Sequence, residues 1–227
     1  MSELVALSRS GGKDSALALL ELSRCGTPPS VLLTTFDESS RTVPHHGVPI
    51  DLIAAQAHAV GLPLAAVALP PAASNVTYEQ RLSEAFAAPP LDTVATVAFG
   101  DLFLEDLRAY REARMEDAGR RALFPLWGCQ TGALARSFID HGFKAIVVSV
   151  DGEQLDHGFL GRTFDEELLD ELPEHADPCG ERGEFHTFVH DGPIFEQRVA
   201  IKSGDSSTDG RFAWMALSRD GQDSALP

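Results

Sequence analysis

Residues 10–15 read Ser-Gly-Gly-Lys-Asp-Ser (SGGKDS). They lie between a short apolar run, Leu4–Ser8, and a segment with helical spacing, residues 15–24. A strand that turns through glycines into a helix is a common anion site, because the backbone approaches the ligand closely and the first N–H groups of the helix point at it. The serines add hydroxyl donors and the lysine adds a full positive charge. This stretch therefore predicts an α/β fold and a phosphate-binding loop made of Ser10, Gly11, Gly12, Lys13, Asp14 and Ser15.

The spacing of this loop differs from that of two commoner phosphate motifs. A Walker loop needs four residues between its first glycine and the Gly-Lys pair, and the dinucleotide fingerprint is GxGxxG. An ordinary glycine turn with a capping serine would explain the glycines and serines, but not Lys13 and Asp14 together. Asp14 falls in the first helical turn, where it suits the helix dipole, and it is the candidate for holding Mg²⁺ through a phosphate or a water.

Segments that follow the loop alternate between strand and helix patterns. Strands are expected at residues 4–8, 30–36, 64–69, 93–99 and 123–127, and helices at residues 15–24, 50–60, 78–87 and 105–121. Strands that are apolar on both sides and separated by helices are typical of a parallel sheet covered on both faces. The sequence thus predicts a doubly wound, Rossmann-like parallel sheet of five strands over residues 1–128.

The pattern changes after residue 128. One more helix and strand are followed by an acidic stretch and then by β-like alternation, at residues 131–141, 144–150, 164–177, 184–189, 194–201 and 212–217. This predicts a smaller α+β domain over residues 129–227. Because no long linker separates the two parts, we expect them to pack closely around a cleft, with the second contributing residues to an acceptor site.

Composition argues against several classes of function. The 227 residues carry 18 Lys and Arg against 34 Asp and Glu, a net charge of −16, which is unfavourable for binding a polyanion such as nucleic acid. No apolar stretch approaches the roughly 20 residues of a membrane span, and the first residues lack a signal-peptide pattern, so a cytoplasmic protein is expected. Cys25, Cys129 and Cys179 are widely spaced, which disfavours a disulfide framework or a zinc ribbon.

The SGGKDS stretch resembles the PP-loop of ATP pyrophosphatases, which cleave ATP to AMP and pyrophosphate while adenylating a substrate. The resemblance implies that the loop grips the leaving pyrophosphate. It also implies that adenosine lies near the ends of the first two strands, which places residues 6–8 and 35–37, with Asp37, beside it. Gly100 and Asp101 end the fourth strand and are further nucleotide-binding candidates, although Asp101 could instead cap a helix.

Further segments resemble the diphthine–ammonia ligase family. They are HGVP at 46–49, QA at 56–57, GLPL at 61–64, YE at 78–79, GD at 100–101, PLWG at 125–128, CGERGEFHT at 179–187 and GPIF at 192–195. Arg182 stands where glycine is common in that family. The resemblance implies an ATP-dependent amidoligase that adenylates a carboxylate and transfers ammonia to it, releasing AMP and pyrophosphate, with diphthine on an elongation factor as the acceptor.

Three residues are the catalytic candidates for such a reaction. Lys13 and the loop amides would stabilise the departing pyrophosphate. Glu184 and His186 alternate on an expected strand and should face the same side, which assigns them to the acceptor or ammonia side of the cleft. Glu184 would bind or deprotonate ammonium, and His186 would place the adenylate. An exposed strand face with two polar residues is the plainer alternative.

Three more residues are expected to bind the substrate. Gly183 would allow close backbone approach, Thr187 would point away from His186 and support it by hydrogen bonding, and His46 would line the cleft. A metal site at His45 and His46 is disfavoured, because adjacent residues rarely ligate one ion and no third ligand is suitably spaced.

Two other functions stay open. The same adenylation chemistry could act on another carboxylate, such as a small metabolite of the cobalamin-precursor kind. Fifteen arginines against three lysines, with abundant alanine, suggest a GC-rich bacterial genome, whereas diphthamide belongs to archaeal and eukaryotic translation. A non-catalytic adenine-nucleotide sensor is the other reading. Free ammonia is the expected nitrogen source, because no cysteine is placed for releasing it from glutamine, and a homodimer is kept open.

Overall fold

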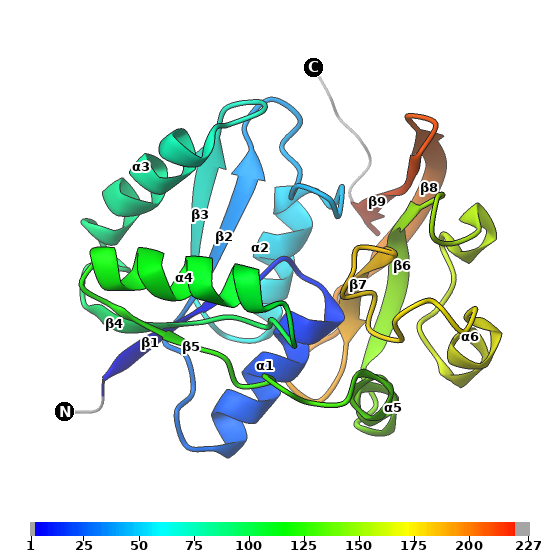
Figure 1. Cartoon of the computed structure of the whole chain (residues 1–227), viewed down its shortest axis with the longest axis horizontal. Helices are drawn as coiled ribbons and strands as arrows, with labels where there is room; N and C mark the ends of the chain where they lie inside the picture. The colour runs from blue at the N-terminus through cyan, green and yellow to red at the C-terminus, as the bar shows by residue number, and fades with distance from the viewer. Residues whose placement is uncertain (1–2, 221–227) are drawn as a thin grey trace.

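A computed structural model describes residues 3–220 and contains two sheets (Figure 1). The first is parallel, with strand order β3-β2-β1-β4-β5. Its strands are β1 (Leu4–Ser8), β2 (Val31–Asp37), β3 (Leu64–Leu69), β4 (Val94–Ala98) and β5 (Arg121–Leu123). The connecting helices are α1 (Lys13–Arg24), α2 (Ile50–Ala59), α3 (Asn75–Phe86) and α4 (Glu105–Asp117). The predicted five-stranded doubly wound sheet is confirmed.

The strand order creates a crevice at one edge of this sheet. From β1 the chain moves outward through β2 to β3, then returns to the other side of β1 for β4 and β5. The connections that follow β1 and β4 therefore leave the sheet in opposite directions, and ligands of open α/β sheets bind at this switch point. The SGGKDS loop follows β1 and Gly100 follows β4, so both lie at the crevice.

Alternating side chains of β1 divide the core of this part into two layers. Leu7 packs with Leu17 of α1 on one face, and Ala6 packs with Phe86 of α3 and Met115 of α4 on the other. All of these side chains are buried, so helices shield both faces of the sheet, as the apolar strands require. Among the described residues, no helix is both long and apolar enough to span a membrane.

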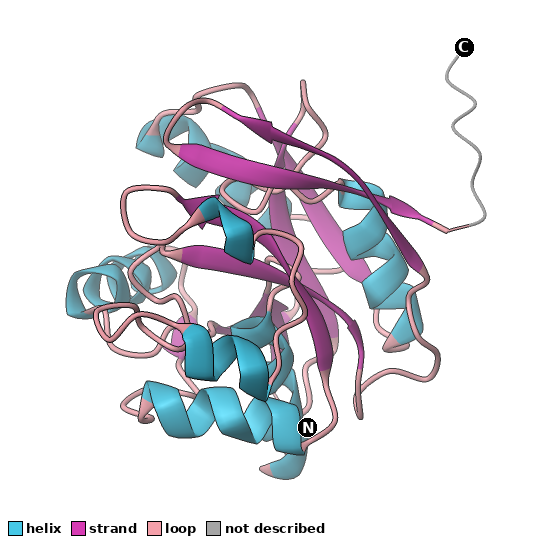
Figure 2. Cartoon of the chain, turned by 90° about the vertical axis from the view of Figure 1, so that its right-hand side faces the viewer, coloured by secondary structure: helices cyan, strands magenta, loops and turns pink. Residues whose placement is uncertain are grey.

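The second sheet is antiparallel, with order β7-β6-β9-β8. The side of the molecule that carries this sheet faces the viewer in Figure 2. Its elements are α5 (Thr131–Asp140), β6 (Lys144–Asp151), the short 3₁₀ helix η1 (His157–Phe159), α6 (Glu166–Glu171), β7 (Phe185–Asp191), β8 (Ile201–Thr208) and β9 (Phe212–Arg219). Phe138 of α5 and Phe185 of β7 belong to the same buried cluster as Leu17 of α1. One continuous core thus joins the two parts, and the smaller α+β part is confirmed.

Two predicted strands differ from the structure. The fifth strand of the parallel sheet is residues 121–123 rather than 123–127, because Pro125 has no N–H to donate and the chain turns at Phe124–Trp127. The expected strand at 194–201 is mostly a loop, since β8 begins only at Ile201. This loop instead packs on the first part of the chain, where the Glu196 N–H donates to the Ala59 carbonyl (2.7 Å).

Candidate active site

A cavity of about 430 Å³ opens at the carboxyl ends of β1, β2 and β4. The phosphate loop forms one wall, and α3 and α4 contribute an apolar wall that includes Tyr78, Leu82 and Met115, with Phe99 at the end of β4 beside it. Cys179, Gly180, Glu181, Phe185, His186 and Thr187 of the second part close the third side. The cavity therefore lies between the two parts of the chain, where the sequence predicted a cleft.

The two glycines of the phosphate loop are needed for different reasons. Gly11 has a φ of +88°, and a Cβ there would lie 2.6 Å from Ile53 Cδ1. A Cβ at Gly12 would lie 3.2 Å from the Thr187 carbonyl oxygen. The Ser15 hydroxyl donates to the Gly12 carbonyl (2.8 Å) and holds the first turn of α1. The loop can therefore take this path only without side chains at its tip.

Two buried side chains that the sequence analysis did not single out hold the loop from beneath. Gln56 of α2 donates through Nε2 to the carbonyls of Gly11 (3.0 Å) and Val189, and its Oε1 accepts from Arg9 Nη2 (2.8 Å). Burial lowers the pKa of Arg9 to about 10, which still leaves it charged at neutral pH. This network connects the loop to α2 and β7, and only the tertiary structure brings its members together.

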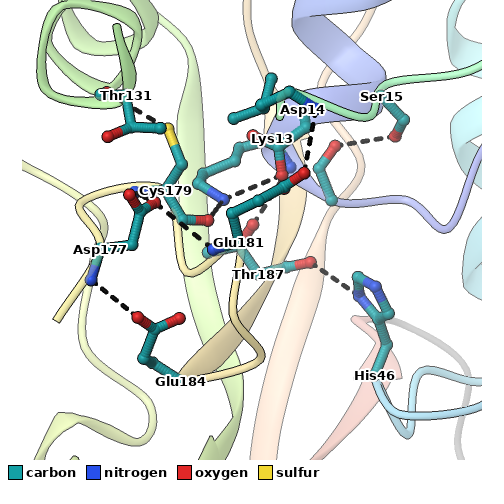
Figure 3. Close-up of polar contacts among 12 residues, drawn as sticks. Lys13, Asp14, Ser15, His46, Thr131, Asp177, Cys179, Glu181, Glu184 and Thr187 are labelled. Carbon is teal, nitrogen blue, oxygen red and sulfur yellow. Dashed lines mark hydrogen bonds and ion pairs between the residues drawn. The ribbon is translucent and has the colours of Figure 1, made fainter. Parts of the chain in front are cut away.

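Lys13 reaches across the cavity to the second part of the chain (Figure 3). Its Nζ donates to Asp14 Oδ2 (2.9 Å) and to the Cys179 carbonyl, and it lies 5.4 Å from the centre of the Phe185 ring. Burial by itself would lower the pKa of Lys13, but Asp14, Cys179 and Glu181 outweigh it and the pKa is raised. The Lys13 side chain is therefore positively charged at neutral pH, as anion binding requires.

Carboxylates organise the loop of residues 177–184 that receives Lys13. Asp177 Oδ1 accepts from the Cys179 N–H (2.8 Å), while Glu184 accepts from the Asp177 N–H at Oε1 (2.8 Å) and from the Arg182 N–H at Oε2 (3.0 Å). Each carboxylate satisfies backbone donors that a tight loop would otherwise leave unpaired.

The prediction that Glu184 and His186 face the same side of a strand is wrong. Glu184 precedes β7, which begins at Phe185, so strand alternation does not apply to it. Its side chain is 1% exposed and occupied by loop N–H groups, and neither it nor Gly183 lines the cavity, whereas His186 does. Gly183 has a φ of +85°, so its glycine serves the turn rather than close approach to a ligand.

Glu181 lines the cavity in the place expected for Glu184. Its Oε1 accepts from the Leu102 N–H (2.9 Å), which connects this loop to the end of β4. Burial raises the pKa of Glu181 to about 7, and the nearby Asp14 and Asp101 carboxylates add to the effect. The residue belongs to the CGERGEFHT segment, but spacing alone gave no reason to choose it over Glu184.

Gly100 and Asp101 lie at the cavity, as predicted. A Cβ on Gly100 would lie 3.1 Å from the Asp14 carbonyl carbon, so this glycine allows β4 to approach the start of α1. Asp101 forms an ion pair with Arg111 of α4 (Oδ2 to Nε, 2.7 Å), and Arg111 stacks over Phe99 with its Cζ 4.4 Å from the ring centre. Arg111, which the sequence analysis missed, adds a cation to this wall.

Asp37 does not reach the cavity. Its Oδ1 accepts from the N–H groups of Ser39 (3.0 Å) and Ser40 (2.8 Å), so the carboxylate holds a turn at the end of β2. Thr34 and Thr35, slightly earlier in the same strand, line the cavity instead. The end of β2 therefore meets the cavity through these threonines and not through Asp37.

Imidazoles from the two parts of the chain meet at the cavity. The rings of His46 and His186 lie 4.4 Å apart between centroids, and His45 lies 6.2 Å from His186. His46 Nδ1 lies 3.3 Å from the Thr187 carbonyl oxygen, and the Thr187 hydroxyl accepts from the Lys13 N–H (3.1 Å). Burial lowers the pKa of His46 to about 4 and that of His186 well below its usual value.

The site therefore combines an anion-binding end with neutral proton acceptors. Loop N–H groups and Lys13 suit a phosphate, and the imidazoles suit a ligand that donates hydrogen bonds. Within residues 3–220, no three His, Cys, Asp or Glu side chains are grouped to hold a metal ion by themselves. The parallel sheet with SGGKDS at its switch point is the arrangement that the resemblance to a PP-loop protein implied.

Comparison with known families gives a closer assignment. The family model of the diphthamide synthase N-terminal domain matches residues 3–122, and that of the diphthamide synthase C-terminal domain matches residues 130–221. The chain belongs to the diphthamide synthase family.

Three curated relatives carry the name diphthine–ammonia ligase. The protein of Schizosaccharomyces pombe is 25% identical over 219 residues, which cover 85% of this chain and 35% of that protein. The Mus musculus protein is 32% identical over 129 residues, 50% of this chain and 48% of that protein. The Danio rerio protein is 28% identical over 234 residues, 90% of this chain and 89% of that protein. The matches thus span about a third to a half of the first two relatives and most of the third.

Proposed function

We propose that this protein is an ATP-dependent ligase that adenylates a substrate carboxylate and replaces AMP with ammonia, giving an amide, AMP and pyrophosphate. The observation that carries the proposal is the shared cavity, in which the phosphate loop with Lys13 faces the His46 and His186 imidazoles. An anion site and a proton-accepting site side by side are what adenylation followed by amine attack requires. The family membership and the names of the relatives support the same reaction.

The phosphate end of the cavity would bind the β- and γ-phosphates of ATP. Lys13 exchanges its present acceptors, Asp14 and the Cys179 carbonyl, for phosphate oxygens, and the first N–H groups of α1 add the positive end of the helix dipole. These donors favour the departing pyrophosphate more than the intact ATP, because negative charge develops there in the transition state. Cleavage therefore needs no protein nucleophile.

Asp14 fits a magnesium ion that arrives with ATP. Its Oδ1 is buried and, among the described residues, has no hydrogen-bond partner, while Oδ2 is paired with Lys13. Carboxylate oxygen is the donor that Mg²⁺ prefers, and the ion would neutralise charge on the phosphates. In this role Asp14 would hold the ion directly or through a water.

The acceptor end would hold the carboxylate and then the ammonia. Asp101 is already paired with Arg111, and Glu181 with the Leu102 N–H, which leaves the imidazoles and Thr187 as the polar groups nearest the loop. The relatives' name supports diphthine on an elongation factor as the acceptor. Catalysis at this end is mainly positioning, because AMP is a good leaving group.

The decisive experiment incubates the protein with ATP, Mg²⁺, ammonium chloride and an elongation factor that carries diphthine. AMP and pyrophosphate should appear in equal amounts and only when the acceptor is present. The acceptor should lose one negative charge by isoelectric focusing, and mass spectrometry should show the exchange of a carboxyl OH for NH₂. Release of ADP would contradict the adenylation chemistry. Turnover with a small carboxylate but not with the elongation factor would keep the chemistry and change the acceptor, and binding of ATP without any turnover would indicate a sensor.

A further inference from the structure

We propose that His46 and His186 form the ammonium subsite of this enzyme and accept the protons that ammonium releases as the amide forms. The inference rests on the proposed ligase activity and assigns to these two side chains the role that the sequence analysis gave to Glu184. It follows from the hydrogen-bonding state of the rings, their place beside the phosphate loop and the way in which they are held.

The hydrogen bond of His46 to the backbone uses Nδ1 and leaves the lone pair of Nε2 free for a ligand. A carbonyl oxygen can only accept, so the contact between Nδ1 and the Thr187 carbonyl (3.3 Å) assigns the proton to Nδ1. Nε2 is then an acceptor. Among the contacts of the described residues, neither ring nitrogen of His186 has a protein partner, although the ring lines the cavity. Two neighbouring acceptors suit a ligand with several N–H groups and do not suit a phosphate or carboxylate oxygen.

The surroundings keep both rings uncharged. Burial, followed by the neighbouring Lys13 and the other imidazoles, lowers the pKa of His186, and burial is also the main cause for His46. Neutral rings retain the lone pairs that a small cation needs. Lys13 is paired with Asp14 in the structure and would be paired with phosphate oxygens once ATP is bound, so in neither state would an ammonium ion face an unbalanced positive charge.

Thr187 connects the imidazoles to the phosphate loop. Its carbonyl contacts His46, its hydroxyl accepts from the Lys13 N–H, and a Cβ on Gly12 would lie only 3.1 Å from His46 Cε1. A nitrogen held by the lone pairs at the edges of the two rings, whose centroids are 4.4 Å apart, would therefore sit next to the loop, on the side where the acyl group of an adenylate must project. This proximity is what attack on the acyl carbon needs.

The chemistry balances with two acceptors. Ammonium gives up one proton to free its lone pair, which attacks the acyl carbon and forms the C–N bond. The C–O bond to AMP breaks with its electron pair staying on the phosphate oxygen, and the nitrogen loses a second proton to become the amide. The imidazoles take up one proton each in turn and pass it on to water, and the negative charge of the adenylate phosphate and of pyrophosphate still bound favours the imidazolium state.

The loop that carries His46 is held in place by the second sheet. His45 has a φ of +64°, an uncommon conformation for a residue other than glycine, and its carbonyl accepts from Trp214 Nε1 (3.2 Å). A Cβ on Gly47 would lie 2.7 Å from Trp214 Cδ1, so the indole packs directly against this turn. His46 is thus fixed opposite His186 before any ligand binds.

The kinetic test separates adenylation from ammonia transfer. His46→Phe and His186→Phe remove the lone pairs but keep a ring, and each should raise the KM for ammonium on the order of 10- to 100-fold, the effect of losing a hydrogen bond to a charged group. Exchange of labelled pyrophosphate into ATP, driven by the acceptor without ammonium, should change less than about twofold. His190→Phe on the same strand, outside the cavity, is the matched control and should match the wild type in both assays.

Conservative variants separate binding from proton transfer. His186→Gln keeps an acceptor but not a base, so it should retain much of the affinity for ammonium and lose turnover. Hydroxylamine, which is uncharged at neutral pH and sheds one proton fewer, should restore part of that turnover. Loss of pyrophosphate exchange in step with amide formation, with an unchanged KM for ammonium, would overturn the proposal and make the pair a binding site for the adenylate.

A direct measurement of ammonium binding tests the subsite even if the protein has no ligase activity. In the wild-type protein with histidine labelled with ¹⁵N, ammonium chloride should shift the ring resonances of His46 and His186 to saturation, and sodium chloride at equal concentration should not. Equal responses to the two salts would overturn the subsite. Saturation by ammonium in a protein that never releases AMP would keep the subsite and overturn the ligase.

Discussion

Two loops face each other across the cavity, and they are built by opposite means. The phosphate loop, residues 10–15, presents backbone N–H groups outward and has no side chains at its glycine tip. The loop of residues 177–184 uses its N–H groups internally, on the carboxylates of Asp177 and Glu184, and presents the Cys179 carbonyl to Lys13 instead. One loop is a donor surface for an anion, and the other is an acceptor surface for a cation.

This difference changes how the two sequence motifs should be interpreted. In SGGKDS the polar residues themselves line the cavity, so the motif and the proposed binding site coincide. In CGERGEFHT the acidic residue next to the strand, Glu184, accepts hydrogen bonds from loop N–H groups and does not line the cavity. Glu181, His186 and Thr187 are among the residues of this segment that do. A conspicuous carboxylate in a turn is often a backbone cap, because turns leave N–H groups unpaired.

The largest expected effect comes from removing the charge that joins the loops. Lys13→Met should lower AMP release about 10²- to 10³-fold, because one preorganised donor to the departing pyrophosphate is lost. The measurement is steady-state AMP release at saturating ATP. Lys144→Met, at an exposed position of β6, is the control and should be fully active. A Lys13→Met protein with normal turnover would show that the Lys13 side chain serves only to hold the Cys179 carbonyl.

The second prediction asks whether Glu184 is a cap or a catalyst. Glu184→Gln replaces one acceptor oxygen with an N–H group that faces another N–H, so the free energy of unfolding should fall by about 1–3 kcal/mol. Denaturation in urea measures this. Glu153→Gln, with a side chain 67% exposed, should stay within about 0.5 kcal/mol of the wild type. A Glu184→Gln protein of unchanged stability and no activity would restore the catalytic role that the sequence analysis assigned.

The third prediction concerns pH and the Glu181 side chain. Its pKa of about 7 in the folded chain exceeds the unfolded value of about 4.3, so between these values the folded state keeps a proton that the unfolded state has lost. Stability should therefore fall as pH rises from about 4 to about 7. Glu181→Gln should remove this slope and be more stable than the wild type by about 1 kcal/mol at about pH 8, with little difference at about pH 4.

Urea denaturation at the two pH values measures the difference. Glu181→Gln keeps an oxygen that can accept from the Leu102 N–H, so the loop contact is preserved in the variant. Parallel stability curves for the two proteins across this range would show that the Glu181 carboxyl titrates normally and that the acceptor loop is more open to water than its packing indicates.

Most of the fold could be predicted from the sequence, because its signals are local. The apolar runs that became β1 to β4 are bounded by Gly and Pro, and the phosphate loop marks the start of α1. The fifth strand shifted because its bounds depend on pairing with Thr96–Ala98 of β4 and not on its own hydrophobicity. The segment at 194–200 was misassigned because Phe195 and Val199 are apolar for packing against the cluster that contains residues of α2, a contact between distant parts of the chain.

The site residues also separate into those that a local sequence signal predicts and those that only folding brings together. Six consecutive residues predict the phosphate loop. Three pairs form only in the folded chain: Arg9 with Gln56, Arg111 with Asp101, and His46 with His186. Asp37 was assigned to the nucleotide by its position and Glu184 to the acceptor side by its place on an expected strand. Both instead accept from backbone N–H groups, which lie two and three residues away for Asp37 and two and seven residues away for Glu184. Residue type alone cannot separate a cap from a ligand, since the same carboxylate oxygens do both.

The smallest expected effect is at the point where the two parts of the chain touch. Thr187→Val keeps the shape of the side chain but removes the hydroxyl that accepts from the backbone N–H of Lys13. The loss of this hydrogen bond costs about 1 kcal/mol, so the KM for ATP should rise roughly fivefold with kcat little changed. Thr187→Ser keeps the hydroxyl and should behave like the wild type. If Thr187→Val instead raised only the KM for ammonium, the hydroxyl would matter through His46, whose Nδ1 faces the carbonyl of the same residue, and the donor and acceptor surfaces would be coupled through this one side chain.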